Sequence, residues 1–136
     1  MLIKGILDPE DAEKALSIGA DAISVSNQGG RQIDGGPSSI AMLPSIVDTI
    51  DGRAEVFLDG GIRTGQQILK AVCLGARGVL IGRAALYGLA AGGEAGMTQA
   101  LSLLRKELDH SMAFCGIRAL ESSSRTNLSA FQSIQA

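Results

Sequence analysis

The chain has 136 residues, enough for one domain, and 46% of them are hydrophobic, which suits a packed core and argues against global disorder. Its 12 lysines and arginines nearly balance its 14 aspartates and glutamates, and the net charge of −2 excludes the strongly basic surface that a nucleic acid or an anionic membrane would favour. No apolar run reaches the roughly 18 residues of a membrane-spanning helix, so we expect no transmembrane segment.

The cysteines and the single histidine give no sign of a metal site. Cys73, Cys115 and His110 do not stand at a spacing typical of metal ligands, so we expect no bound metal. Cys73 lies inside an apolar helical run and is expected to be a small core residue. Free thiols without a signal peptide favour a reducing, cytoplasmic location.

The first segment predicts the end of a strand followed by a helix. Lys4 is expected at the C-terminal end of a strand, and so few residues precede it that the chain should begin within an element. Asp8 suits the N-cap of the helix and Pro9 suits its first position. Gly19 is expected to end the helix in a left-handed conformation. The expected apolar stripe consists of Ala12, Ala15, Leu16 and Ile18.

An internal repeat with a period of 56 residues organises the next part of the chain. Residues 5–6 and 61–62 are both Gly-Ile, and residues 19–20 and 75–76 are both Gly-Ala. Each copy is a glycine turn, a helix, a Gly-Ala pair and a short apolar strand. The repeat therefore predicts two copies of one strand-and-helix unit.

Short apolar runs predict three further strands, at residues 22–25, 55–58 and 79–81. Runs of this kind are typical of parallel strands that are buried on both faces. Between them we expect a helix over residues 38–50, interrupted at Pro44, and a second helix that begins with a capping box of Thr64 and Gln67. The alternation of strands and helices predicts a parallel α/β architecture.

The C-terminal part predicts one long helix and a tail. The helix is expected over residues 94–114. After Glu121 the chain is polar, so residues 122–136 are expected to be a flexible tail and residues 1–121 the folded domain.

Four clusters of glycine and polar residues each follow a predicted strand. They are Lys4-Gly5, residues 26–31, residues 59–63 and Gly82-Arg83. In a barrel of βα units such clusters gather on one face. Glycine allows close backbone approach and the start of a helix favours an anion, so the last two clusters predict a phosphate site. The alternative interpretation is that the glycines only form turns and that the arginines are only surface charges.

The second cluster and Lys4 indicate a more specific chemistry. Arg31 can hold a carboxylate through paired hydrogen bonds. Ser26 and Asn27 can bond the polar edge of a ring, and Lys4 can place a cation beside an electron-accepting ring. The alternatives are that Lys4 is a solvated chain end and that Gln28 is a loop amide without a chemical role.

Together these motifs resemble those of the FMN-dependent α-hydroxy-acid dehydrogenases and oxidases, the family of glycolate oxidase, L-lactate dehydrogenase, mandelate dehydrogenase and the flavin domain of flavocytochrome b2. The resemblance extends from Ile3 to about Leu120 and rests on several motifs in order at the family's spacing. It implies an α/β fold, the C-terminal half of a TIM (β/α)8 barrel, with approximately strands 5–8 and their helices.

The resemblance also implies a cofactor, a substrate and residue roles. The cofactor is FMN, which receives electrons as a small 2-hydroxy acid is oxidised to a 2-keto acid. Lys4 faces the flavin and acts in catalysis, Ser26 contacts the flavin, and Arg31 pairs with the substrate carboxylate. The remainder of FMN is held by Asp59, Gly60, Gly61, Ile62, Arg63, Gly82 and Arg83.

Gln28 departs from the family pattern, because it occupies the position of the catalytic histidine. An amide cannot take up the substrate proton, and a complete barrel needs about 250 residues, so the chain alone is expected to be impaired or inactive. One alternative is a non-catalytic fragment or subunit that self-associates or pairs with a missing N-terminal half. Another is a different phosphate-binding TIM-barrel enzyme, such as an IMP-dehydrogenase-like protein.

Overall fold

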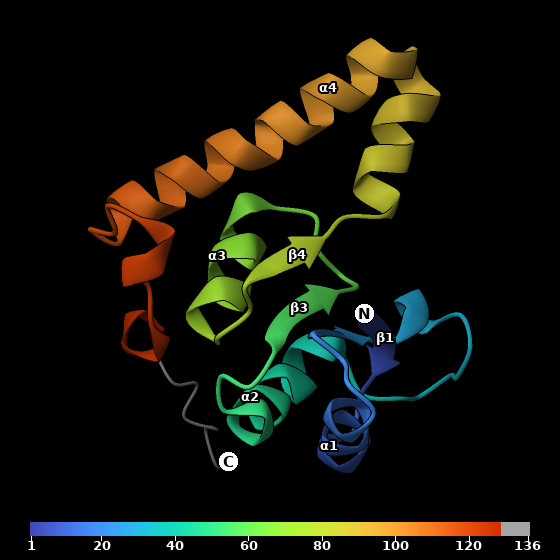
Figure 1. Ribbon diagram of the computed structural model, residues 1–136. Coiled ribbons are helices and arrows are strands. Elements are labelled where there is room, and N and C mark those ends of the chain that lie inside the picture. Colours follow the sequence, from blue (N-terminus) through green and yellow to red (C-terminus); the bar gives the residue numbers. More distant parts are fainter. Residues whose placement is uncertain (129–136) are drawn as a thin grey trace, which may run out of the picture.

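The computed structural model describes residues 1–128, which form a four-stranded parallel sheet flanked by helices (Figure 1). The spatial order of the strands is their order in the chain. In the pairing of the two central strands, the last residue pairs are Val25 with Leu58 and Ser26 with Asp59. The strands are β1 (Leu2–Ile6), β2 (Ala22–Ser26), β3 (Glu55–Asp59) and β4 (Gly78–Leu80).

Each pair of neighbouring strands is joined through a helix, which confirms the predicted alternation. The connecting helices are α1 (Pro9–Ser17), α2 (Ser39–Ile50) and α3 (Gly65–Cys73), and the last strand leads into α4 (Arg83–Phe114). Short 3₁₀ turns lie at Gln28–Gly30, Leu120–Ser122 and Arg125–Asn127. A parallel sheet with helical connections is the α/β architecture that the sequence predicts.

The predicted helix caps are confirmed by their hydrogen bonds. The Asp8 carboxylate accepts a bond of 2.7 Å from the backbone N–H of Glu10. Thr64 and Gln67 form the reciprocal capping box at the start of α3. The stripe of α1 was wrong at one position: Ile18 is the C-cap residue and is 70% exposed, because the helix ends before it turns toward the core.

Two further expectations about helices are corrected by the structure. Pro44 does not interrupt α2, which runs unbroken through it. Proline costs one backbone bond within a helix, but here the same helix buries Leu43, Ile46 and Ile50 almost completely, and that burial offsets the cost. The helix predicted over residues 94–114 is confirmed as the part of α4 after its kink, whereas the part before the kink, which begins at Arg83, was missed.

Helix α4 is a bent element with two limbs. The backbone leaves helical geometry at Gly92 and Gly93, where Gly93 has a φ of 58°. The first limb rises from β4 and the second returns across α3 (Figure 1). The limbs meet at Gly88 and Gly96, where a side chain on either residue would collide with the other's carbonyl group.

The main core lies between the sheet and its connecting helices and is aliphatic, as the composition predicts. Its fully buried members include Ile23, Val25 and Leu58 from the strands. A second cluster between α3 and α4 contains Leu69, Cys73 and Ile117, so the prediction that Cys73 is a core residue is confirmed. The second cluster packs α4 against α3.

The segment after Glu121 is described as far as Leu128. Arg125 forms an ion pair of 2.7 Å with Asp48 of α2, and Leu128 packs against the second cluster. The rest of the expected tail, residues 129–136, lies outside the described residues. Among residues 1–128, the helices are too short or too polar for any of them to cross a membrane.

Candidate functional site

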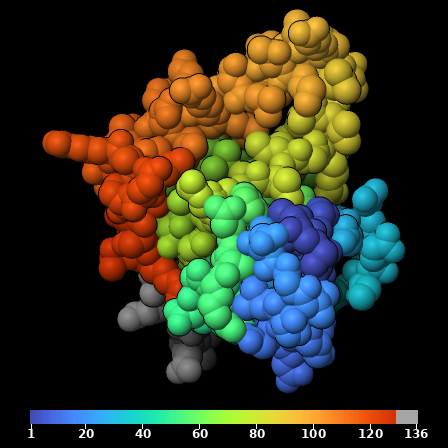
Figure 2. Space-filling model, in the orientation of Figure 1, coloured from blue at the N-terminus to red at the C-terminus, as the bar shows by residue number. Residues whose placement is uncertain are grey.

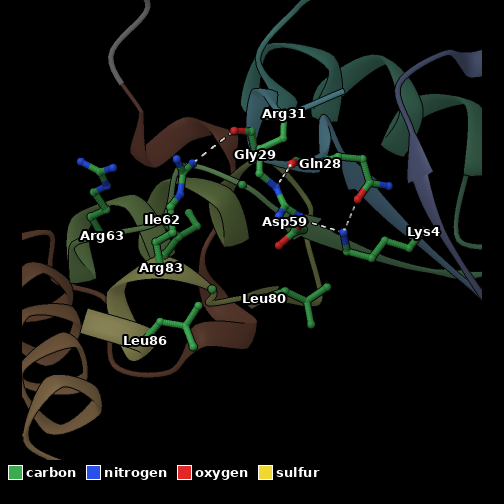
Figure 3. A pocket seen from close by; sticks show the side chains of 13 residues that line it. Lys4, Gln28, Gly29, Arg31, Asp59, Ile62, Arg63, Leu80, Arg83 and Leu86 are labelled. Atoms are coloured by element: carbon green, nitrogen blue, oxygen red, sulfur yellow. Dashed lines mark hydrogen bonds and ion pairs between the residues drawn. The ribbon is translucent and has the colours of Figure 1, made fainter. Parts of the chain in front are cut away.

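A cavity of about 320 Å³ lies at the C-terminal ends of the strands (Figure 3). All four predicted clusters contribute to it, because parallel strands end at the same edge of a sheet. Its lining residues are Lys4, Gln28, Gly29, Arg31, Asp59, Gly60, Gly61, Ile62, Arg63, Leu80, Gly82, Arg83 and Leu86. Ten of the eleven predicted site residues therefore meet here, and Ser26 lies directly behind them.

Lys4 is held by three acceptors from the chain itself. Its Nζ lies 2.8 Å from Oδ2 of Asp59, 3.1 Å from Oε1 of Gln28 and 3.2 Å from Oγ of Ser26. An ammonium group has three N–H donors, so these three contacts satisfy it. Lys4, which lies inside β1 rather than at its end as predicted, thereby joins that strand to the last residues of β2 and β3.

Ser26 connects the members of this network. Its hydroxyl is buried, donates a bond of 2.6 Å to Oδ2 of Asp59 and accepts one of 3.1 Å from the backbone N–H of Gln28. Partial burial acts to raise the pKa of Asp59, but the bonds from Lys4 and Ser26 and the charge of Lys4 outweigh it, so that pKa lies below its usual value. Asp59 is therefore ionised at neutral pH and balances the charge of Lys4.

Gln28 has a left-handed backbone, with a φ of 56°, which is unusual for a residue with a side chain. Its side chain extends toward Lys4 (Figure 3). A Cβ at Gly5 would lie 2.7 Å from Nε2 of Gln28, so only glycine leaves room for this arrangement. The position presents an amide to the cavity, which can donate or accept hydrogen bonds but cannot carry a proton away.

The loop after β2 is stabilised by its own polar residues. Oδ1 of Asn27 accepts a bond of 3.1 Å from the backbone N–H of Gly29, while the backbone N–H of Asn27 donates to Oγ of Ser39 over 3.0 Å. Asn27 does not line the cavity, so the structure shows it shaping the loop that carries Gln28 and Arg31.

The other end of the cavity is positively charged and open at two glycine turns. Arg63 and Arg83 line the cavity beside the glycine turns, whereas its single carboxylate, Asp59, is paired with Lys4. No atom would lie within 4 Å of a Cβ at Gly61 or at Gly82. Gly82 is the N-cap of α4, where no side chain bonds the first helical N–H groups. Free N–H groups, glycine and arginine are the features that favour a phosphate group.

Sequence reasoning missed two lining residues, Leu80 and Leu86, while Gly29 belongs to the predicted cluster of residues 26–31. Leu80 ends β4, and Leu86 lies one turn into α4, so both could have been found if the helix had been predicted to start at Arg83. Their side chains are 39% and 58% exposed and give the charged cavity an apolar wall. His110 lies on the second limb of α4 and does not line the cavity.

Known proteins match this chain closely. The family model for FMN-dependent dehydrogenases matches residues 1–130. An L-lactate dehydrogenase of Caulobacter vibrioides is 53% identical over 94% of the chain, and an L-lactate oxidase of a Nostoc species is 53% identical over 89% of it. The chain spans about a third of the length of these relatives, 33% of each.

Solved structures agree with the fold. A mandelate oxidase variant with a monooxide FMN adduct superposes with a TM-score of 0.88 at 46% identity, over 91% of this chain and 40% of that one. Mandelate oxidase with benzoyl-formic acid gives the same TM-score and identity, over 37% of its own chain. The prediction of a partial TIM (β/α)8 barrel is thereby confirmed. The motifs, the strand-end cavity and these matches agree that the chain belongs to the family of FMN-dependent dehydrogenases.

Proposed function

We propose that the chain binds FMN in the strand-end cavity, with the FMN phosphate between Gly60-Gly61 and Gly82-Arg83. The observation that carries the proposal is the positively charged end of the cavity, where two open glycine turns meet the uncapped start of α4. Asp59, Ile62 and Arg63 would complete the contacts with the cofactor. FMN, when bound, supplies the acceptor for the two electrons removed from a hydroxy acid.

Lys4 would hold a positive charge against the flavin ring. Asp59 and Ser26 keep its ammonium group at the ends of β1, β2 and β3. Gln28 accepts the bond that is exposed to solvent, so it is the partner that an incoming ligand displaces at least cost. The residues would therefore need no rearrangement beyond that of one side chain.

Arg31 would hold the carboxylate of a small 2-hydroxy acid. Its Nε donates to the carbonyl of Gln28 over 3.2 Å, while its terminal nitrogens form no hydrogen bond within residues 1–128. A guanidinium with two free terminal nitrogens can bind both oxygens of a carboxylate. The relatives include an L-lactate dehydrogenase and a mandelate oxidase variant solved with (S)-mandelic acid, and lactate and mandelate are both 2-hydroxy acids.

Oxidation of that acid would be strongly impaired at Gln28. The substrate hydroxyl must lose a proton, and the amide offers no group with a suitable pKa. Asp59, the one carboxylate that lines the cavity, is a poor substitute because its pKa is lowered and Lys4 already occupies it. Loss of a positioned base costs on the order of 10²–10⁴ in rate.

Titration of FMN into the purified chain, followed by quenching of flavin fluorescence, tests the proposal. We expect saturable binding that inorganic phosphate weakens by competition. Arg83→Gln should reduce the affinity roughly tenfold, since a charge-assisted contact is lost. Arg77→Gln is the matched control, because Arg77 pairs with Glu55 at the opposite end of the sheet. A folded chain that leaves flavin fluorescence unchanged would refute the proposal.

A second candidate function is that of a non-catalytic subunit that assembles with a complementary half-barrel or with a second copy. The supporting observation is the open sheet: β1 and β4 each pair on one edge only, and Leu2, Leu80 and Leu86 are exposed nearby. Co-expression with the N-terminal part of the Caulobacter relative, followed by co-purification, tests this role. A colourless complex would support the subunit, whereas a yellow complex would support FMN binding.

A further inference from the structure

Helices α3 and α4 each end at a cysteine. Cys73 is the last residue of α3, and Cys115 is the C-cap of α4. Both line a second cavity, of about 480 Å³, that shares no residue with the strand-end cavity. The thiols therefore form a site apart from the one discussed above.

The packing of α3 against α4 brings the two thiols to this place. The backbones touch where α3 begins, since a side chain at Gly65 would collide with the backbone of Glu107 and Leu108. The Glu107 carboxylate also accepts a bond of 2.8 Å from the backbone N–H of Gly65. Further along, Cys73 packs in one buried cluster with Ile117, which lies two residues after Cys115.

The environments of the thiols differ. Cys73 is buried, and burial raises its pKa, with a smaller contribution in the same direction from the neighbouring Cys115. Cys115 is exposed at the rim of the cavity. An exposed thiol meets an oxidant first, and a second thiol that lines the same cavity is placed to react with the product.

We propose that Cys73 and Cys115 are an oxidation site that closes to a reversible disulfide in the presence of a hydroperoxide. The Cys115 sulfur attacks the peroxide, forms a sulfenic acid and releases the alcohol or water. The Cys73 sulfur then displaces hydroxide, which leaves as water, and the S–S bond forms. Two thiols lose two electrons and two protons, and the peroxide O–O bond is reduced by the same two electrons.

The disulfide would join the C-terminal ends of α3 and α4 and close a loop that contains β4 and both limbs of α4. A cross-link over a loop of this length restricts the unfolded chain. We expect the melting temperature of the oxidised chain to rise by roughly 5–15 °C. The cavity near Cys73 would narrow, while the strand-end cavity would keep its residues.

The full chain, treated with hydrogen peroxide and digested without reductant, tests the proposal. We expect a peptide that links Cys73 to Cys115 in monomeric protein, lighter by two hydrogen atoms, and its loss on addition of thiol. Equilibration with glutathione, in buffer and in concentrated urea, should give an equilibrium constant for the disulfide roughly tenfold or more higher in the folded chain.

The matched control moves the exposed thiol along the chain. The double variant Cys115→Ser and Arg118→Cys keeps the loop length similar but places the thiol beyond Ile117 on an exposed residue. In this variant the equilibrium constant for the disulfide should be the same in buffer as in concentrated urea. Equal constants in buffer and urea for the natural pair, or cross-links only between molecules, would overturn the proposal. None of these readouts depends on FMN binding.

Discussion

At the scale of single residues, Lys4 is the centre of the candidate site, and its neighbours divide into two kinds. Asp59 and Ser26 hold it through part-buried bonds, whereas the bond to Gln28 is exposed. The first pair determines where the charge lies. Gln28 faces the cavity, and displacing its bond to Lys4 would leave that N–H group free to bind a ligand.

Restoring a base at position 28 should restore chemistry. With the N-terminal part of a family member supplied in trans, Gln28→His is expected to bleach the flavin with lactate or mandelate roughly 10²–10⁴ times faster than the natural chain. Gln28→Asn, which keeps an amide, should stay slow. Equal bleaching rates for the glutamine and histidine forms would show that this position does not carry the proton.

The pair of Asp59 and Lys4 predicts a pH dependence of stability. The folded state lowers the pKa of Asp59, so the pair contributes stability above the carboxyl's ordinary pKa and loses it as the pH falls through the lowered value. Asp59→Asn, without flavin, should lower the free energy of unfolding by about 1–2 kcal/mol at neutral pH. Urea titrations should show that difference shrinking below about pH 4. A difference that stays constant with pH would contradict this origin.

Much of the site could be predicted from the sequence, because its residues stand in short motifs that follow the predicted strands. The glycine turns and arginines stand at strand ends that the sequence marks, and the structure brings them together. The link from Lys4 through Asp59 to Ser26 could not be predicted. It depends on the register that places three strand ends side by side, and a single sequence does not show which strands are neighbours.

At the scale of elements, the contact between α3 and α4 depends on a missing side chain. Gly65→Ala should force the backbones of the two helices apart at Glu107 and destabilise the chain by about 2–4 kcal/mol. Gly36→Ala is the matched control, since its Cβ would meet only ordinary contacts near Ile33. Chemical denaturation measures both, and equal midpoints would contradict the close approach.

The elements were predictable where caps and periodicity agree. Asp8 and Thr64 mark their helices through local hydrogen bonds, and the structure has both. The part of α4 before its kink was missed because Gly82 offers no capping side chain and because Gly88, Gly92 and Gly93 obscure the helical period. The close packing of the two limbs of α4 at Gly88 and Gly96 is a tertiary contact. It stabilises the helix there although glycine has a low helix propensity.

At the scale of the whole molecule, the sheet is open and α4 stands above the body of the protein (Figure 2). Apolar side chains on α4, such as Leu86, Tyr87 and Leu103, are exposed. We expect the isolated chain to self-associate at micromolar concentration, since open edges and apolar surface favour association. Light scattering measures this, and a monodisperse monomer with cooperative unfolding would contradict it.

The central position of β2 has a consequence for the exchange of backbone hydrogens with solvent. Its residues are all buried, and both of its neighbours are strands, whereas β4 pairs on one side over only three residues. Amides of Ile23 and Val25 should therefore exchange with deuterium most slowly, and those of β4 and the first limb of α4 much faster. Mass spectrometry after brief labelling would show it, and uniform protection would contradict it. The part of the cavity built on Ser26 and Asp59, at the ends of the two central strands, would then stay in place during openings that separate Arg83 from it.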